Sequence, residues 1–181
     1  MKHKDSHAQA STYHQLGRVA HEQKRWKQAE QYYKQALQIS IDYKDHYAQA
    51  TIYRSLGGLA YERRQWGQAE QYCLQALQIS IEHNDHHAQA STYHNLGMVA
   101  HEQGQWEQAE QYYLQALKTF VEYEDSYSGR IVFASLAQLW RQRNDADLPG
   151  RVASAIGATA KDIEDLFQGL LRDMPGGKKR G

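Results

Sequence analysis

Histidine is the residue type in this sequence that could most readily do chemistry, since imidazole binds metals and titrates near neutral pH. The chain has 10 histidines among 181 residues. His14 and His21 stand seven residues apart, which on a helix separates them by about 10 Å, too far for both to hold one ion. His83 and His87 are four apart, but Asn84-Asp85 between them predicts a helix boundary. We therefore expect no metal site and no cofactor.

No pattern typical of an enzyme is present either. The sequence contains no phosphate-binding glycine loop, no nucleophile elbow and no paired carboxylates in an apolar setting. The dipeptide His-Glu recurs at residues 21–22 and 101–102, but adjacent residues on a helix point about 100° apart and do not face each other. We expect a protein that is not an enzyme.

Composition narrows the class of partner. Lys and Arg number 21, as do Asp and Glu, so the net charge is zero and no overall field attracts nucleic acid or an anionic membrane. The mean hydropathy is −0.84, and no run of apolar residues is long enough to span a membrane. The N-terminus lacks the apolar core of a signal peptide. We expect a cytoplasmic protein in which Cys73, the only cysteine, is a small buried side chain.

An internal repeat of 40 residues predicts the helices that position the histidines and the other candidate residues. About 25 of 34 positions are identical between residues 7–40 and 87–120, with a looser copy between them. A shift of 40 residues aligns these sets: Leu16, Leu56 and Leu96; Gly17, Gly57 and Gly97; Trp26, Trp66 and Trp106; Ala36, Ala76 and Ala116. Apolar residues at spacings of three and four predict two helices in each copy. Asp45, Asp85 and Asp125 are the expected N-caps, and the glycines are expected where the two helices pack closely.

The stretch "YHQLGRVAHEQKRWKQAEQYYKQAL" strongly resembles the tetratricopeptide repeat (TPR), at Leu16, Gly17, Ala20, Ala29, Tyr33 and Ala36 and at each 40-residue step. The period of 40 rather than 34 is similar to the long-helix variety of kinesin light chains and bacterial signalling adaptors. The resemblance implies an all-α, right-handed TPR-like α-solenoid with C-terminal capping helices. It also implies a protein-protein interaction scaffold that is part of a larger bacterial signalling protein.

The sequence divides into seven segments. They are the remnant of a preceding helix (1–6), repeats 1, 2 and 3 (7–46, 47–86 and 87–126), a degenerate half-repeat (127–148), a C-terminal helical cap (149–174) and a flexible basic tail (175–181). Because His3-Lys4-Asp5 corresponds to His83-Asn84-Asp85, the chain reads as if it were cut from a longer protein. Thr159 and Asp162 predict the start of the last helix.

In the superhelices of this family, the first helix of each repeat lines a concave groove. Carried over, the resemblance implies that a peptide or helix of a partner protein binds at Ser11, His14, Arg18, His21 and Glu22 in repeat 1, at Thr51, Arg54, Gly58, Tyr61 and Glu62 in repeat 2, and at Ser91, His94, Met98, His101 and Glu102 in repeat 3. The column Arg18, Gly58, Met98 varies most. We attribute this variation to the choice of ligand, and drift on a solvated face is the alternative explanation.

Two other functions stay open. Nearly identical repeats could stack end to end, so the repeat ends could mediate self-association. Nucleic acid could bind through His14, Arg18, Arg54 and the basic tail, but the neutral charge and the groove glutamates Glu22, Glu62 and Glu102 make this the weakest alternative.

Overall fold

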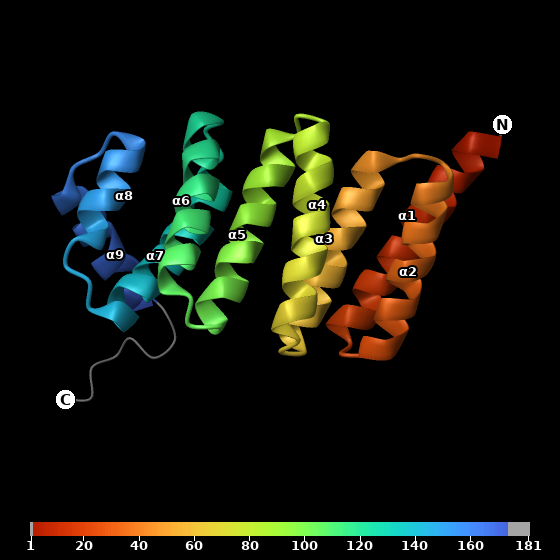
Figure 1. Ribbon diagram of the computed structural model, residues 1–181, viewed down its shortest axis with the longest axis horizontal. Coiled ribbons are helices and arrows are strands. Elements are labelled where there is room, and N and C mark those ends of the chain that lie inside the picture. Colours follow the sequence, from red (N-terminus) through yellow and green to blue (C-terminus); the bar gives the residue numbers. More distant parts are fainter. Residues whose placement is uncertain (1, 174–181) are drawn as a thin grey trace.

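The computed structural model describes residues 2–173, with side chains from His7 onward, and this part of the chain folds as an all-α solenoid. Its helices are α1 (Lys2–Glu22), α2 (Trp26–Asp42), α3 (His46–Glu62), α4 (Trp66–Glu82), α5 (His86–Glu102), α6 (Trp106–Glu122), α7 (Ser126–Arg143), α8 (Leu148–Ile156) and α9 (Ala160–Asp173). Figure 1 shows them in one row, with α1 and the α8–α9 pair at opposite ends. None of the described helices is long and apolar enough to cross a bilayer.

Three-residue turns join α1 through α7, and each turn uses the same backbone device. Its middle residue has a positive φ, and the N–H of the next residue bonds back five residues, as when Arg25 N–H donates to the Ala20 carbonyl at 2.8 Å. This arrangement satisfies carbonyls that the helix end leaves free. Gly104 occupies one such position without strain, whereas Lys24 and Arg64 occupy the equivalent ones with side chains that disfavour it.

The predicted N-caps are confirmed at the starts of α3, α5 and α7. Asp45, Asp85 and Asp125 each accept a hydrogen bond of 2.9 Å from the backbone amide three residues later. At the start of α9, the Asp162 amide donates to the Thr159 hydroxyl at 3.2 Å. These bonds satisfy amides that the first turn of a helix leaves unpaired.

The glycine of each repeat lies where the two helices of a pair come closest. A Cβ atom on Gly17 would stand 2.5 Å from the ring of Tyr33, and one on Gly97 would stand 2.5 Å from the ring of Tyr113. In repeat 2, a Cβ on Gly57 would stand 2.9 Å from the Cys73 sulfur. The expected close packing is therefore present, and an aromatic ring or a sulfur atom fills the space above the glycine.

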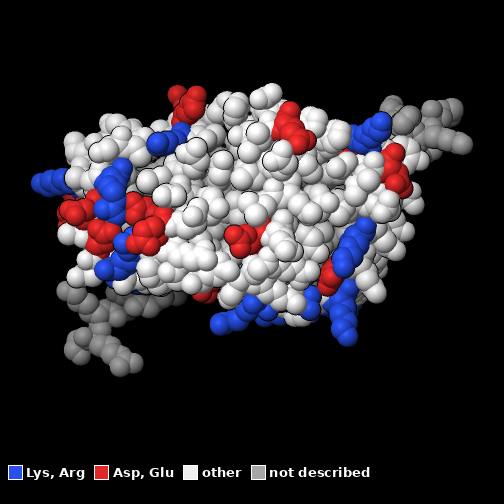
Figure 2. Space-filling view, in the orientation of Figure 1, with Lys and Arg blue, Asp and Glu red and all other residues white. Residues whose placement is uncertain are grey.

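The C-terminal cap is fixed to the solenoid by apolar packing and by ion pairs. The ring centroids of Trp140 on α7 and Phe167 on α9 lie 5.7 Å apart. Glu110 on α6 is 8% exposed, and its carboxylate pairs with Arg151 of α8 at 2.6 Å and with Arg143 at 3.5 Å. Figure 2 shows charged groups gathered over the α6–α8 end of the face it draws, with few over the middle.

The observed helix bounds differ from the expected segments at the two ends. Helix α1 runs through residue 6 without interruption, so no boundary separates residues 2–6 from repeat 1. The first cap helix begins at Leu148, one residue before the expected cap. The expected basic tail, 175–181, lies outside the described residues.

The glycine contact generates a test with a matched control. Gly97→Ala should destabilise the protein by about 1–2 kcal/mol, because the buried Tyr113 ring must move to admit the methyl group. Gly58→Ala should stabilise it by about 0.5–1 kcal/mol, because a Cβ there meets no atom within 4 Å and alanine favours the helix. Urea unfolding followed by circular dichroism measures both changes. Equal effects of the two substitutions would contradict the packing assigned to Gly97.

Candidate functional site

The concave side of the solenoid is formed by the odd-numbered helices. Helices α1, α3, α5 and α7 each contact the next odd-numbered helix, whereas α2, α4 and α6 lie farther from one another. The array therefore curves with the odd-numbered helices inside, and we call their shared surface the groove. The outer, convex side belongs to the even-numbered helices.

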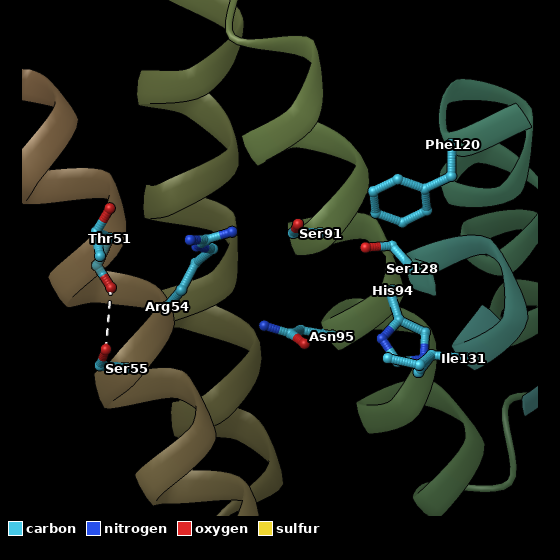
Figure 3. A pocket seen from close by; sticks show the side chains of 9 residues that line it. All are labelled: Thr51, Arg54, Ser55, Ser91, His94, Asn95, Phe120, Ser128 and Ile131. Atoms are coloured by element: carbon cyan, nitrogen blue, oxygen red, sulfur yellow. Dashed lines mark hydrogen bonds between the residues drawn. The ribbon is translucent and has the colours of Figure 1, made fainter. Parts of the chain in front are cut away.

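Two adjoining pockets open along the groove and share Thr51. The larger, of about 340 Å³, lies between α3 and α5 and extends to α7; it is lined by Thr51, Arg54, Ser55, Ser91, His94, Asn95, Phe120, Ser128 and Ile131 (Figure 3). The smaller, of about 210 Å³, lies between α1 and α3; it is lined by His7, Ala10, Ser11, His14, Tyr47, Ala48, Thr51 and Ile52. Both pockets occupy the N-terminal halves of the groove helices.

The C-terminal halves of the same helices are bridged by side chains that lie 41 residues apart. His21 Nε2 lies 3.2 Å from Glu62 Oε1, the Tyr61 hydroxyl donates to Glu102 at 3.5 Å, and His101 Nε2 lies 2.6 Å from Gln142 Oε1. We call each such contact between neighbouring groove helices a rung. The rungs occupy that half of the groove with contacts internal to the protein.

Rungs also form in the N-terminal halves, but only at two of the three junctions. His14 Nε2 lies 2.8 Å from Ser55 Oγ between α1 and α3, and His94 Nε2 lies 3.0 Å from Ser135 Oγ between α5 and α7. The equivalent pair between α3 and α5 is Arg54 and Asn95, and these two side chains form no hydrogen bond. We call this position, where the contact is missing, the open rung, and the larger pocket lies there.

Arg54 is the charged group of the larger pocket, and it has no ion-pair partner among the described residues. Its Nε is buried without a hydrogen-bond acceptor, and burial lowers the pKa of the guanidinium. Figure 3 shows its side chain directed from α3 toward α5, while the Asn95 amide points back toward α3. An arginine stays protonated at neutral pH in any such setting, so the pocket carries a positive charge.

Two of the groove histidines, His14 and His94, are held in their neutral form at pH 7. Burial lowers the pKa of His94 to about 4. Burial, followed by the charges of Arg18 and Arg54, also lowers the pKa of His14. The two imidazoles therefore supply hydrogen-bonding groups rather than positive charge.

The structure brings some of the predicted groove residues together and separates others. Ser11, His14, Thr51, Arg54, Ser91 and His94 line the pockets. His21, Tyr61, Glu62, His101 and Glu102 form rungs instead. Arg18 and Glu22 are exposed outside both pockets, a Cβ on Gly58 would meet open space, and Met98 packs against the C-terminal core.

Sequence reasoning missed several pocket residues. Ser55 and Asn95 lie one helical turn after Thr51 and Ser91, so helical spacing could have identified them. Phe120, Ser128 and Ile131 come from the end of α6 and from α7, and the repeat comparison alone gives no sign of their approach. No group of three or more metal-ligating side chains occurs among the described residues.

The lowered pKa of His94 gives a pH prediction. Between pH 6.5 and about 4 the unfolded chain binds a proton at His94 that the folded chain does not, so stability falls as the pH drops through this range. The slope contributed by this group is at most about 1.4 kcal/mol per pH unit. Denaturant unfolding at pH 7 and pH 5 should show a smaller loss of stability for His94→Gln than for the parent. Equal losses would contradict a buried, neutral His94.

The sequence of this chain matches the model of a known protein family. The sequence model described as tetratricopeptide repeat matches residues 8–82 and 48–120. No curated protein sequence matches the chain.

Solved structures share the fold at low sequence identity. BtubC (BKLC) from P. vanneervenii has a TM-score of 0.75 and 22% identity, over 96% of this chain and 66% of that one. The apo form of RapI has a TM-score of 0.76 and 18% identity, over 93% of this chain and 48% of that one. A signal transduction ATPase with a tetratricopeptide repeat sensor, from Pyrococcus horikoshii, has a TM-score of 0.70 and 19% identity, over 92% of this chain and 26% of that one.

The chain thus spans less than two thirds of each of these structures, and the likeness concerns the fold. The two family matches together span residues 8–120, more than half of the sequence. The protein is therefore a member of the tetratricopeptide repeat family, whose repeats generally serve as non-catalytic scaffolds for binding other proteins.

Proposed function

We propose that this chain binds an extended peptide segment, or a helix, of a partner protein in the groove. The observation that carries the proposal is the pair of adjoining pockets, which together reach from α1 to α7 and meet at Thr51. Volumes of about 340 and 210 Å³ suit individual side chains of a ligand that runs across the helices.

The chemistry of the pocket walls supports a peptide ligand. Hydroxyl and amide groups from Ser91, Ser128 and Asn95 can pair with the backbone N–H and C=O groups of an extended strand, which need partners once they leave water. In the smaller pocket, Ala10 and Ile52 add an apolar surface that suits an aliphatic side chain.

The wider role that we propose is that of a sensor or adaptor segment within a larger cytoplasmic signalling protein. One structure of similar fold is a signal transduction ATPase in which the tetratricopeptide repeats are the sensor. The buried thiol of Cys73, whose pKa burial raises to about 12, suits a reducing compartment because it is not poised to react.

The groove can be tested by blocking it. Peptides are selected from a random displayed library on the parent chain and then measured against two variants. Ser91→Trp should abolish binding, because it fills the larger pocket. Gln75→Trp, on the exposed side of α4, adds the same side chain to the convex surface and should leave the affinity unchanged. Fluorescence anisotropy with labelled peptides measures both.

The result that contradicts the proposal is equally specific. If no peptide is selected, or if the selected peptides bind Ser91→Trp as tightly as the parent, the groove is not the binding surface. Thermal unfolding of each variant must be measured alongside, so that loss of fold is not mistaken for loss of binding.

Self-association is a second candidate, and one observation favours it. Leu16 and Val19 of α1, at the N-terminal end of the helix row, are 42% and 50% exposed, whereas the equivalent Leu56 and Leu59 are at most 2% exposed. A second copy of the chain could cover this apolar surface. Sedimentation should then show a mass that rises with concentration for the parent and a constant monomer mass for Leu16→Glu. A constant monomer mass of the parent would remove this candidate.

A further inference from the structure

The junctions between neighbouring repeats differ in the number of polar contacts that join the two repeats. Four pairs of positions connect each repeat to the next, at separations of 38, 41, 41 and 33 residues. Between repeats 1 and 2 all four pairs interact: His7–Asp45 at 2.8 Å, His14–Ser55 at 2.8 Å, His21–Glu62 at 3.2 Å and Glu30–Arg63 at 3.1 Å. Between repeat 3 and the half-repeat all four recur: His87–Asp125 at 3.0 Å, His94–Ser135 at 3.0 Å, His101–Gln142 at 2.6 Å and Glu110–Arg143 at 3.5 Å.

The central junction keeps one of the four contacts. Tyr61 and Glu102 meet at 3.5 Å, whereas the pairs Tyr47–Asp85, Arg54–Asn95 and Glu70–Gln103 form no hydrogen bond or ion pair among the described residues. The apolar core is also divided here, into two small clusters, one around Val99 and one around Leu96. This junction therefore leaves polar groups free to bond with something other than the protein itself.

Arg54 is the group for which this matters most. A guanidinium that is drawn out of water without a counter-ion is costly to the fold, because its charge and its N–H donors lose their hydration. The other partly buried arginines avoid this cost: Arg63 pairs with Glu30, and Arg143 pairs with Glu110. Within the described residues no carboxylate forms an ion pair with Arg54, although the charge of Asp85 acts on the guanidinium from farther away. A ligand carboxylate would supply the direct counter-ion, and the hydrogen-bond acceptor that the Arg54 Nε–H lacks.

Repeat 2 has a smaller side chain beside Arg54 than repeats 1 and 3 have at the same position. Where repeats 1 and 3 have the rings of Tyr33 and Tyr113 beside His14 and His94, at 5.6 and 5.7 Å, repeat 2 has the small Cys73. A tyrosine ring at that place would compete with the long side chain of Arg54 for the same space. The small Cys73 side chain thus leaves that space to Arg54, which lines the pocket.

We propose that the pocket at the open rung binds the carboxylate of an aspartate or glutamate side chain in the peptide, with the Arg54 guanidinium as its counter-ion. This inference rests on the peptide-binding function proposed above. Asn95 and Ser91 line the same pocket as neutral hydrogen-bonding groups. The single positive charge of the pocket matches the single charge of a carboxylate better than the double charge of a phosphate, and the planar fork of arginine suits a carboxylate.

The experiment is a double-mutant cycle between protein and peptide. Peptides that bind the parent chain and fail to bind Ser91→Trp should share an acidic residue at one position. Replacing it by Gln or Asn should weaken binding to the parent by about tenfold or more, but should have little effect on binding to Arg54→Gln. Arg54→Lys should restore part of the affinity. Arg25→Gln, which removes an exposed arginine from the turn after α1, should behave like the parent.

A titration with small probes separates the possible anions. The side-chain Nε–H signal of Arg54 is followed by NMR while N-acetylglutamate amide, its glutamine analogue or inorganic phosphate is added. Saturable shifts with the glutamate compound alone support the inference, and tighter binding of phosphate would overturn the assignment to a carboxylate.

The two proposals fail in different ways. Peptides that bind in the groove without an acidic residue, or without coupling to Arg54, would overturn the inference and leave the proposed function standing. If no peptide binds in the groove, the proposed function fails, and a titration in which the glutamate compound leaves the Arg54 signal unmoved would overturn the inference as well.

Discussion

The contact between a glycine on the first helix of a repeat and a side chain on the second is the constraint on which this structure depends. Gly17 and Gly97 lie against tyrosine rings so closely that a methyl group could not be added without moving them. This contact sets how near the two helices of a pair lie and leaves the odd-numbered helices in contact along the concave side. The curvature that creates the groove therefore originates inside each helix pair, away from the groove itself.

The same constraint explains why repeat 2 differs from its neighbours. Cys73 replaces the tyrosine above Gly57, and the side chain that faces the groove beside it is Arg54 instead of a histidine. A histidine at that position reaches the next groove helix and forms a rung, as His14 does with Ser55. Arg54 forms none, and the pocket of about 340 Å³ lies beside it. One change in the packing of a helix pair is thus linked to one opening on the ligand-facing surface.

Much of the fold could be predicted from the sequence, because repeated residues report repeated packing. The helix pairs, the aspartate N-caps and the burial of Cys73 follow from local patterns that recur every 40 residues. The division of the groove into a half filled by rungs and a half with pockets could not be predicted in this way. Rungs join residues 41 apart, so an alignment that compares position i with position i+40 never sets the two partners side by side. Met98 shows the same limit: its position varies among repeats, which resembles ligand choice, yet the side chain packs on the core.

The central claim is that the groove can bind a ligand at the central junction because the rung there is open. The most direct test closes it, by copying His14, Tyr33 and Ser55 of the first junction into the second as Arg54→His, Cys73→Tyr and Asn95→Ser. Unfolding by urea and affinity for peptides selected on the parent chain are then measured on the same sample. We predict a variant that is at least as stable as the parent and that binds those peptides about tenfold or more weakly. A folded variant that retains the parent's affinity would contradict the account.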